Sequence, residues 1–256
     1  GESNWFCYPC KVGALLCFVY FNSKYMSSAL SMANLFELAT KEESAQKPDL
    51  VVIFGNDDGN DATNFYYDEA NDIWVGCISD NPRIEYFGYL KKMCLTLHNL
   101  AQMKKGWLPI HGAFVNIYLK DGTKKGIMLM GDSGAGKSES IEALKAAAGD
   151  MIREVEVVFD DMGTIHLEDG VPYGQGTEIG AFIRLDDLDP GTPYRDMDRS
   201  IFMAPENPNS RMIQPAAPYR VVVHNHKIDL FAYANNYTNE FGLKKLTVQE
   251  VKDTCK

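Results

Sequence analysis

The sequence is short of basic residues, because 25 Lys and Arg stand against 35 Asp and Glu and give a formal net charge of −10. Nucleic acids and anionic membranes attract surplus positive charge, so this balance argues against a nonspecific binder of either. Long hydrophobic runs are also missing: the most apolar early run, Gly13–Tyr20, is far shorter than the ~20 residues that cross a bilayer. We therefore expect neither a nucleic-acid partner nor a membrane partner.

Cysteine is scarce and poorly spaced for a metal site. Of the six cysteines, only Cys7 and Cys10 form a C-x-x-C pair, and no second pair follows at zinc-site spacing. A metal or redox role for this pair stays open, but reduced thiols in a cytoplasmic protein are the simpler interpretation. Internal repeats and low-complexity tracts are also missing from the sequence.

What is present fits an ordinary globular chain of 256 residues, with 45% hydrophobic and 23% charged residues. Apolar runs and turn dipeptides predict more strands than helices. We expect strands at 50–54, 73–78, 113–119, 126–130, 155–160, 164–167, 219–224 and 228–233. We expect mixed helical structure over 1–47, with a helix at 27–39, and further helices at 86–103 and 138–148. The pattern predicts an α/β protein with a mixed-sheet core and not a doubly wound parallel sheet.

One motif indicates specific chemistry: a glycine-rich loop follows the apolar strand 126–130 and precedes the predicted helix 138–148. Its residues fit the pattern G-x-x-x-x-G-K-[ST] and are Gly131, Asp132, Ser133, Gly134, Ala135, Gly136, Lys137 and Ser138. Glycines let consecutive backbone N–H groups turn toward phosphates, and the helix N-terminus adds its positive end. Lys137 then reaches the β- and γ-phosphates, and Ser138 binds Mg²⁺. The loop predicts nucleotide binding, and a structural glycine turn is the alternative.

A pair of acidic residues, Asp160 and Asp161, ends the apolar strand that follows the loop. Adjacent carboxylates repel each other unless a cation or a proton neutralises them. We therefore expect the Mg²⁺ of the nucleotide here, with a second metal ion left open; a solvated acidic turn is the alternative. Upstream, the pair Lys91-Lys92 and the lone His111 would by themselves indicate a solvated helix face and a hydrogen-bonded histidine.

The order of these motifs resembles that of the ATP-dependent phosphoenolpyruvate carboxykinases. The resemblance rests on segments 86–92 and 108–111, the glycine-rich loop, the acidic pair, and a later stretch with Glu206-Asn207, Ser210-Arg211 and Pro215. It covers about residues 86–233. It implies a P-loop nucleotide-binding core of that kind over 85–256, preceded by an N-terminal α/β segment over 1–84.

The resemblance also implies roles for individual residues. Lys137 and the loop amides would hold the ATP phosphates, and Ser138 and Asp160 would hold its Mg²⁺. A second metal ion, usually Mn²⁺, would be bound by Lys92, His111 and Asp161, a mixed nitrogen and oxygen set that suits this ion. Lys92 would have to be neutral to act as a ligand. Tyr86 and Arg211 would face substrate carboxylates. The residues implied in catalysis are thus Lys92, His111, Lys137, Asp160, Asp161 and Arg211.

Some details resemble the HPr serine kinase/phosphorylases instead. His111 is followed by Gly-Ala-Phe-Val-Asn-Ile, and Glu139 follows the loop at a position that serves protein phosphorylation in that family. The carboxykinases' second substrate arginine has no clear counterpart, and neither has their nucleotide-contacting lysine around Gly176–Leu185. The chain stops soon after Tyr233, so we expect the lobe that closes over the adenine to be shortened, absent or outside this chain.

The sequence therefore predicts an enzyme for nucleotide-dependent phosphoryl transfer that uses ATP, Mg²⁺ and Mn²⁺. The first hypothesis is the carboxykinase reaction, in which oxaloacetate and ATP give phosphoenolpyruvate, CO₂ and ADP. A kinase or phosphorylase of the HPr-kinase type, acting on a protein or small-molecule hydroxyl group, is the first alternative. A non-catalytic nucleotide-binding module is the second. The expected partners are a nucleotide and either a small dicarboxylate or a hydroxyl acceptor.

Overall fold

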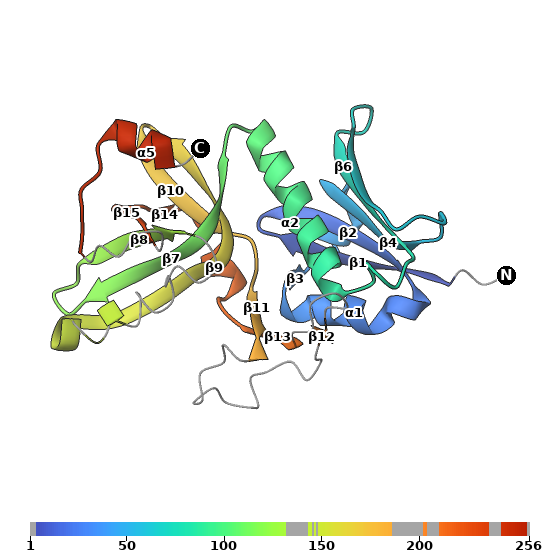
Figure 1. The fold of residues 1–256 in the computed structure, drawn as a ribbon, viewed down its shortest axis with the longest axis horizontal. Helices are drawn as coiled ribbons and strands as arrows, with labels where there is room; N and C mark the ends of the chain where they lie inside the picture. Colours follow the sequence, from blue (N-terminus) through green and yellow to red (C-terminus); the bar gives the residue numbers. More distant parts are fainter. Residues whose placement is uncertain are drawn as a thin grey trace.

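Strands predominate in the fold, which is mixed α/β as the sequence predicts. The computed structural model describes residues 4–131, 143, 144, 146, 148–185, 202, 203, 210–235 and 242–254. In these residues the strands form two six-stranded sheets and one three-stranded sheet. Figure 1 shows the two larger sheets on opposite sides of helix α2 (Phe87–Lys104), with the small sheet beside the start of this helix. Within the described part of the chain, no helix combines the length and the hydropathy of a membrane-spanning segment.

The first sheet comes from the N-terminal third of the chain, and its strand order is β3-β1-β2-β4-β6-β5. Its strands are β1 (Trp5–Val12), β2 (Leu15–Asn22), β3 (Glu37–Leu38), β4 (Leu50–Asn56), β5 (Thr63–Asp68) and β6 (Ile73–Ser79). β2, β4 and β6 run parallel, whereas β1 and β5 pair antiparallel to their neighbours. The sheet is therefore mixed.

The prediction of mixed helical structure over residues 1–47 is wrong for the first half of this range. The apolar run Gly13–Tyr20 forms the turn of a hairpin and most of β2, which lies between β1 and β4. Such a run, without alternation, does not distinguish a buried strand from a buried helix. Helical structure follows in short pieces: α1 (Met26–Ser31), with 3-10 helices at Ser23–Tyr25, Met32–Asn34 and Glu43–Ala45.

The second sheet has the order β14-β10-β9-β7-β8-β15. Its strands are β7 (Leu108–Leu119), β8 (Lys124–Met130), β9 (Ile152–Glu168), β10 (Val171–Gly176), β14 (His226–Lys227) and β15 (Leu230–Tyr233). β15 runs parallel to β8, and the other pairs are antiparallel. β9 covers both strands predicted between residues 155 and 167 as one strand of 17 residues.

The predicted strand 219–224 is wrong, because Tyr219–Val222 forms the short helix α4. Its valines favour a strand, but Pro218 stands in the extended conformation directly before the first helical residue. Proline has no N–H to lose at a helix start, so the chain turns into a helix there. The remaining elements are a 3-10 helix at Gly149–Met151 and α5 (Val248–Thr254).

The small sheet has the order β11-β13-β12. Its strands are β11 (Gly180–Arg184), β12 (Phe202–Met203) and β13 (Ser210–Pro215). Phe182 of β11 and Ile213 of β13 are buried in the core that α2 shares with the first sheet. A separate core lies around Phe114 of β7 and Met128 of β8. The predicted boundary at residue 85 assigns α2 to the C-terminal domain. The apolar side of α2 nevertheless packs on the N-terminal sheet.

Candidate functional site

Three neighbouring strands bring the sequence motifs to one end of the second sheet. β8 ends at Met130, directly before Gly131 of the glycine-rich loop, and Met130 lies opposite Gly112 of β7. Gly112 in turn lies opposite Asp161 of β9. A side chain on Gly112 would place its Cβ 2.4 Å from the carbonyl oxygen of Leu129, so the close approach of β7 and β8 requires glycine. The start of the loop and the acidic pair are therefore only two strands apart.

The glycine-rich loop itself lies outside the described residues, apart from Gly131, which is buried. Its nucleotide-binding and metal-binding residues, Asp132, Ser133, Gly134, Ala135, Gly136, Lys137, Ser138 and Glu139, stay predictions from the sequence. Residues 143, 144, 146 and 148 of the helix expected after the loop are helical.

A cluster of charged side chains surrounds the carboxylate of Asp161. The ammonium nitrogen Nζ of Lys91, on α2, lies 2.5 Å from Oδ2 of Asp161 and 3.2 Å from Oε1 of Glu178. Nε2 of His111, at the start of β7, lies 3.3 Å from the other oxygen of Asp161. One lysine, one histidine and two carboxylates from four segments thus meet here, and the pair His111 and Asp161 predicted from the sequence lies within it.

The lysine in this cluster is Lys91, whereas the sequence interpretation assigned the role to Lys92. Lys92 is exposed on the outer side of α2, and the Lys91 side chain is only 9% exposed. The helix period explains the difference, because Lys91 follows the buried Phe87 by four residues and precedes the buried Cys94 by three. That apolar stripe was the signal in the sequence that distinguishes the two lysines.

Burial and nearby charge have opposite effects on the pKa values of Asp161, Lys91 and Glu178. Burial would raise the pKa of Asp161, but the hydrogen bond from His111 and the charge of Lys91 hold that pKa well below its usual range. Burial also opposes the charge on Lys91, yet Glu178 and Asp161 together raise the Lys91 pKa. The Glu178 side chain is only 6% exposed, and burial raises its pKa to about 7 despite the nearby ammonium group. We infer a charged Lys91–Asp161 pair beside a carboxyl group that readily holds a proton.

Glu178 is the member that the sequence analysis missed. It follows β10, and the residue before it is held twice: the Thr177 hydroxyl donates to the Met162 carbonyl at 2.9 Å, and the Gly13 N–H donates to the Thr177 carbonyl at 2.8 Å. The second bond joins the hairpin turn of the first sheet to the segment that carries Glu178. A lone glutamate in the run Gly176–Gly180 offers no motif, so only the tertiary fold identifies it.

Tyr86 and Arg211, predicted to face the substrate, meet at the ring of Phe182. The Tyr86 and Phe182 ring centroids are 6.1 Å apart, and Cζ of Arg211 lies 5.5 Å from the Phe182 centroid. Nζ of Lys91 lies 5.7 Å from the same centroid, so this ring joins the pair to the charged cluster. Burial raises the pKa of Tyr86, while the positive charges of Arg211 and Lys91 oppose the shift.

The first turn of α2 is shaped to hold the Tyr86 ring. Tyr86 is the residue before the helix, in the extended conformation, and its ring lies against Gly88. A Cβ on Gly88 would come within 2.4 Å of Cε1 of Tyr86. Among the residues that the structure describes, the Tyr86 hydroxyl oxygen is buried without a hydrogen-bond partner. A ligand oxygen placed beside it would supply one.

For a metal ion, the described residues offer a mixed ligand set. In that part of the chain, no three His, Cys, Asp or Glu side chains gather in a metal-binding arrangement. The groups that do converge are Lys91, His111 and Asp161, two nitrogen ligands and one carboxylate, with exposed Asp160 next in the chain. Such a set suits Mn²⁺ better than Mg²⁺, provided that Lys91 gives up its proton.

No protein-family model matches this chain, and a search of curated proteins finds no match either. The resemblance to carboxykinases and HPr kinases therefore rests on the motif residues themselves. The functional conclusion depends on what this arrangement of side chains can do.

Proposed function

We propose that the protein catalyses nucleotide- and metal-dependent phosphoryl transfer on a P-loop core of the carboxykinase or HPr-kinase kind. We further propose a carboxykinase-like reaction, in which oxaloacetate and ATP give phosphoenolpyruvate, CO₂ and ADP. The observation that carries the proposal is the meeting of His111, Asp161 and a buried lysine, with His111 one strand and Asp161 two strands from the start of the glycine-rich loop. Arg211, Tyr86 and this lysine all lie near the ring of Phe182.

In this proposal the loop holds the nucleotide. The amides of the loop and Lys137 neutralise the phosphates, and Ser138 and Asp160 hold the Mg²⁺ that accompanies them. A second divalent cation fits His111 and Asp161, with Lys91 as the third ligand once it is neutral. When bound, this cation would stabilise the negative charge that forms on the enolate oxygen as the C–C bond to CO₂ breaks.

The remaining side chains act on the acid substrate. The Arg211 guanidinium binds a carboxylate through two parallel hydrogen bonds, a geometry that lysine lacks. Tyr86 donates a hydrogen bond from its buried hydroxyl group. Phe182 lies beneath both groups and keeps them in place through ring contacts. The enolate oxygen formed by decarboxylation then attacks the γ-phosphorus, ADP leaves, and the acid is fixed in position for this step.

The loop sequence carries a second candidate function. Glu139, directly after the loop, and Gly112-Ala113 after His111 favour a kinase or phosphorylase of the HPr-kinase type. In that case a hydroxyl oxygen of a protein or small molecule would be the phosphoryl acceptor. Arg211 would then only pack the small sheet against Phe182.

The test is an assay for phosphoenolpyruvate with ATP, Mn²⁺ and oxaloacetate. His111→Ala should lower kcat about a hundredfold or more, because it removes a group beside the developing charge. His224→Ala is the matched control, since His224 is exposed and lies away from the cluster. Lys137→Ala should abolish ATP binding, measured by calorimetry, and leave the thermal melt unchanged.

The outcomes separate the candidates. Phosphoenolpyruvate that disappears in His111→Ala and persists in His224→Ala supports the carboxykinase reaction. Wild-type protein that binds Mg²⁺-ATP, makes no phosphoenolpyruvate and phosphorylates a hydroxyl acceptor contradicts that reaction and supports the second candidate. Binding of Mg²⁺-ATP without turnover of either kind leaves a nucleotide-binding module.

A further inference from the structure

The first sheet has two apolar faces, and α1 and α2 pack on one of them. On this inner face, Val52 and Phe54 of β4 are fully buried in the core that contains α2. A Cβ on Gly76 of β6 would come within 2.4 Å of the sulfur atom of Met93 on the same helix. Successive residues of a strand point to opposite faces, so the residues between these belong to the other face, which we call the outer face. Strand pairing places at its centre Phe18, Tyr20, Val51, Ile53, Val75 and Cys77.

The strands of this sheet have the composition of strands that are covered on both faces. β2, β4 and β6 run parallel, and parallel strands with continuous hydrophobic runs are normally buried on either side. The run Leu50–Phe54 of β4 is such a sequence, yet Val51 and Ile53 on the outer face are half-buried. Tyr20 of β2 is 39% exposed and Tyr66 of β5 is 56% exposed. An apolar surface that extends over several strands indicates an interaction site.

The charge of the molecule favours a second copy of this chain as the partner. The chain carries a net charge of −10, so two copies repel each other wherever their acidic surfaces meet. Within the described strands of the outer face, the charged residues are Lys11 and Asp68, both at the end where β4 begins. Lys11 is paired with Glu43 at 3.0 Å, and Asp68 accepts a hydrogen bond from Asn71 at 2.7 Å. Two outer faces can therefore meet without bringing uncompensated like charges together, whereas a strongly charged partner would lack a counter-charge here.

The size and symmetry of the outer face fit a dimer. β4 is the middle strand of the series β1-β2-β4-β6-β5, so a twofold axis near β4 would superpose the face on its copy. With strands ~4.8 Å apart and a rise of ~3.3 Å per residue, the face measures about 24 Å by 23 Å. Two such faces would bury about 1,100 Å², which reaches the ~1,000 Å² that a specific interface needs. Trp5 and Tyr66 lie on the outermost of these strands, where amphipathic aromatic side chains suit the rim of an interface.

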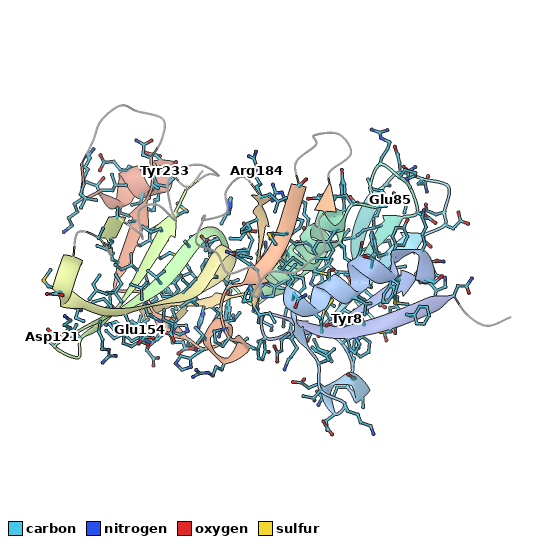
Figure 2. The ribbon with its side chains drawn as sticks, turned by 90° about the horizontal axis from the view of Figure 1, so that it is seen from below. Tyr8, Glu85, Asp121, Glu154, Arg184 and Tyr233 are labelled. Atoms are coloured by element: carbon cyan, nitrogen blue, oxygen red, sulfur yellow. The ribbon has the colours of Figure 1, made fainter. Side chains whose placement is uncertain are left out.

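The outer face is directed away from the candidate functional site. α2 covers the inner face, and the second sheet lies beyond α2, so the outer face points away from the second sheet (Figure 1). Figure 2 shows Tyr8 of the first sheet and Asp121, beside the second sheet, in opposite halves of the molecule. A copy bound to the outer face would therefore leave the charged cluster accessible.

We propose that the protein forms a symmetric dimer in which the outer faces of two copies pack against each other, with Ile53 near the twofold axis. The inference is independent of the proposed function, because the charged cluster is formed by α2, the second sheet and the segment after β10.

The experiment is sedimentation velocity of the full chain over concentrations between about 1 and 100 µM. The wild type should reach a mass of about 57 kDa, twice the 28.7 kDa of one chain, and then stop, because a twofold interface is closed. Ile53→Lys should raise the dissociation constant of the dimer about a hundredfold or more, because it places two ammonium groups beside each other at the axis. Tyr66→Arg, at the rim, should raise it about tenfold. The matched control is Leu167→Lys on β9 of the second sheet, a leucine that is 70% exposed, and it should dimerise as the wild type does.

A native thiol gives the second readout. Cys77 lies on the outer face directly beside Ile53, whereas Cys10, Cys17 and Cys94 are buried. Cys255 lies outside the described residues and is replaced by serine in every protein compared. At high concentration, Cys77 should react with a maleimide about tenfold more slowly in the wild type than in Ile53→Lys, because the interface excludes the reagent. Dilution of the wild type should restore the reaction. Mass spectrometry of peptides distinguishes Cys77 from the exposed Cys7.

Two results would overturn the inference. Wild-type protein that sediments as a monomer at the highest concentration would mean that the outer face does not bind a second copy. A dimer that Leu167→Lys dissociates, and that both outer-face variants leave intact, would place the interface on the second sheet. Thermal melts identify a variant that fails to fold; if Ile53→Lys does, Tyr66→Arg on the exposed edge strand decides. Folded Ile53→Lys should bind Mg²⁺-ATP as the wild type does, so loss of the dimer and failure of the proposed function are separate outcomes.

Discussion

Replacing Lys91 with methionine tests the charged cluster most directly, and Lys92→Met is its control. Methionine keeps the length of the lysine stem but removes the charge that lies between Asp161 and Glu178. Breaking a buried ion pair by removing one partner costs about 3–5 kcal/mol. We expect the lower end, about 3 kcal/mol, because 40% of the Asp161 side chain remains exposed. Lys92 is exposed, so its replacement should change the free energy of unfolding by less than about 0.5 kcal/mol.

The assay is urea unfolding of both variants and the wild type at several pH values. In the wild type, the depressed pKa of Asp161 contributes stability that is present above the usual aspartate pKa and is lost as the pH falls. In Lys91→Met the two carboxylates face each other without a cation, so their pKa values rise and the folded protein takes up protons on acidification. The stability deficit of Lys91→Met should therefore shrink between pH 7.5 and pH 5. Adding Glu178→Gln should recover part of it at pH 7.5.

Two results would refute this reasoning. A loss of stability in Lys92→Met as large as that in Lys91→Met would mean that the helix face is assigned incorrectly. A deficit in Lys91→Met that stays constant with pH would mean that lost packing, and not uncompensated charge, is its cause.

Three further substitutions test the supports of the site and the core. Gly88→Ala should displace the Tyr86 ring and raise KM for the acid several-fold, with ATP affinity unchanged in calorimetry. Gly112→Ala should lower stability by about 1–3 kcal/mol in thermal melts and weaken nucleotide binding, because its Cβ meets the Leu129 carbonyl oxygen. Burial lowers the pKa of His98 to about 4, so protonation of the unfolded chain below about pH 6.5 should destabilise the wild type by about 3 kcal/mol at pH 4. His98→Gln should lack this loss, and an unchanged difference between the two proteins from pH 7 to pH 4 would contradict a buried neutral His98.

The sequence placed His111 and Asp161 in one site only through the resemblance to the carboxykinases. The hairpin dipeptide Asp121-Gly122 pairs β7, which carries His111, with β8, which leads into the loop, and Asp161 lies on β9 at the other side of β7. The order of motifs along the chain is thus a fair guide to which strands are neighbours. The mixed α/β character follows from the same strand and turn signals.

What sequence reasoning could not supply is which side of an element faces inward. Lys91 and Lys92 differ only in their position relative to the apolar side of the helix. Because the two lysines are adjacent, the sequence pattern presents them as one pair and does not distinguish the side on which each lysine lies. Glu178 belongs to the charged cluster because the segment after β10 folds back beside Lys91 of α2, and such a long-range contact leaves no local pattern. The hairpin of β1 and β2 was missed for another reason: an interior strand, buried on both faces, loses the alternation that identifies strands.

The Lys91–Asp161 contact joins residues that lie 70 positions apart in the chain. During synthesis α2 and the first sheet emerge well before β9 and Glu178, so the early chain presents a lysine at an apolar surface with no carboxylate to meet it. The ammonium group must then stay in water, and α2 can pack completely only after β9 and the segment with Glu178 have been synthesised. The charged cluster therefore links completion of the site to the last stage of folding, and a chain that ends before residue 161 should leave this side of α2 exposed and prone to aggregation.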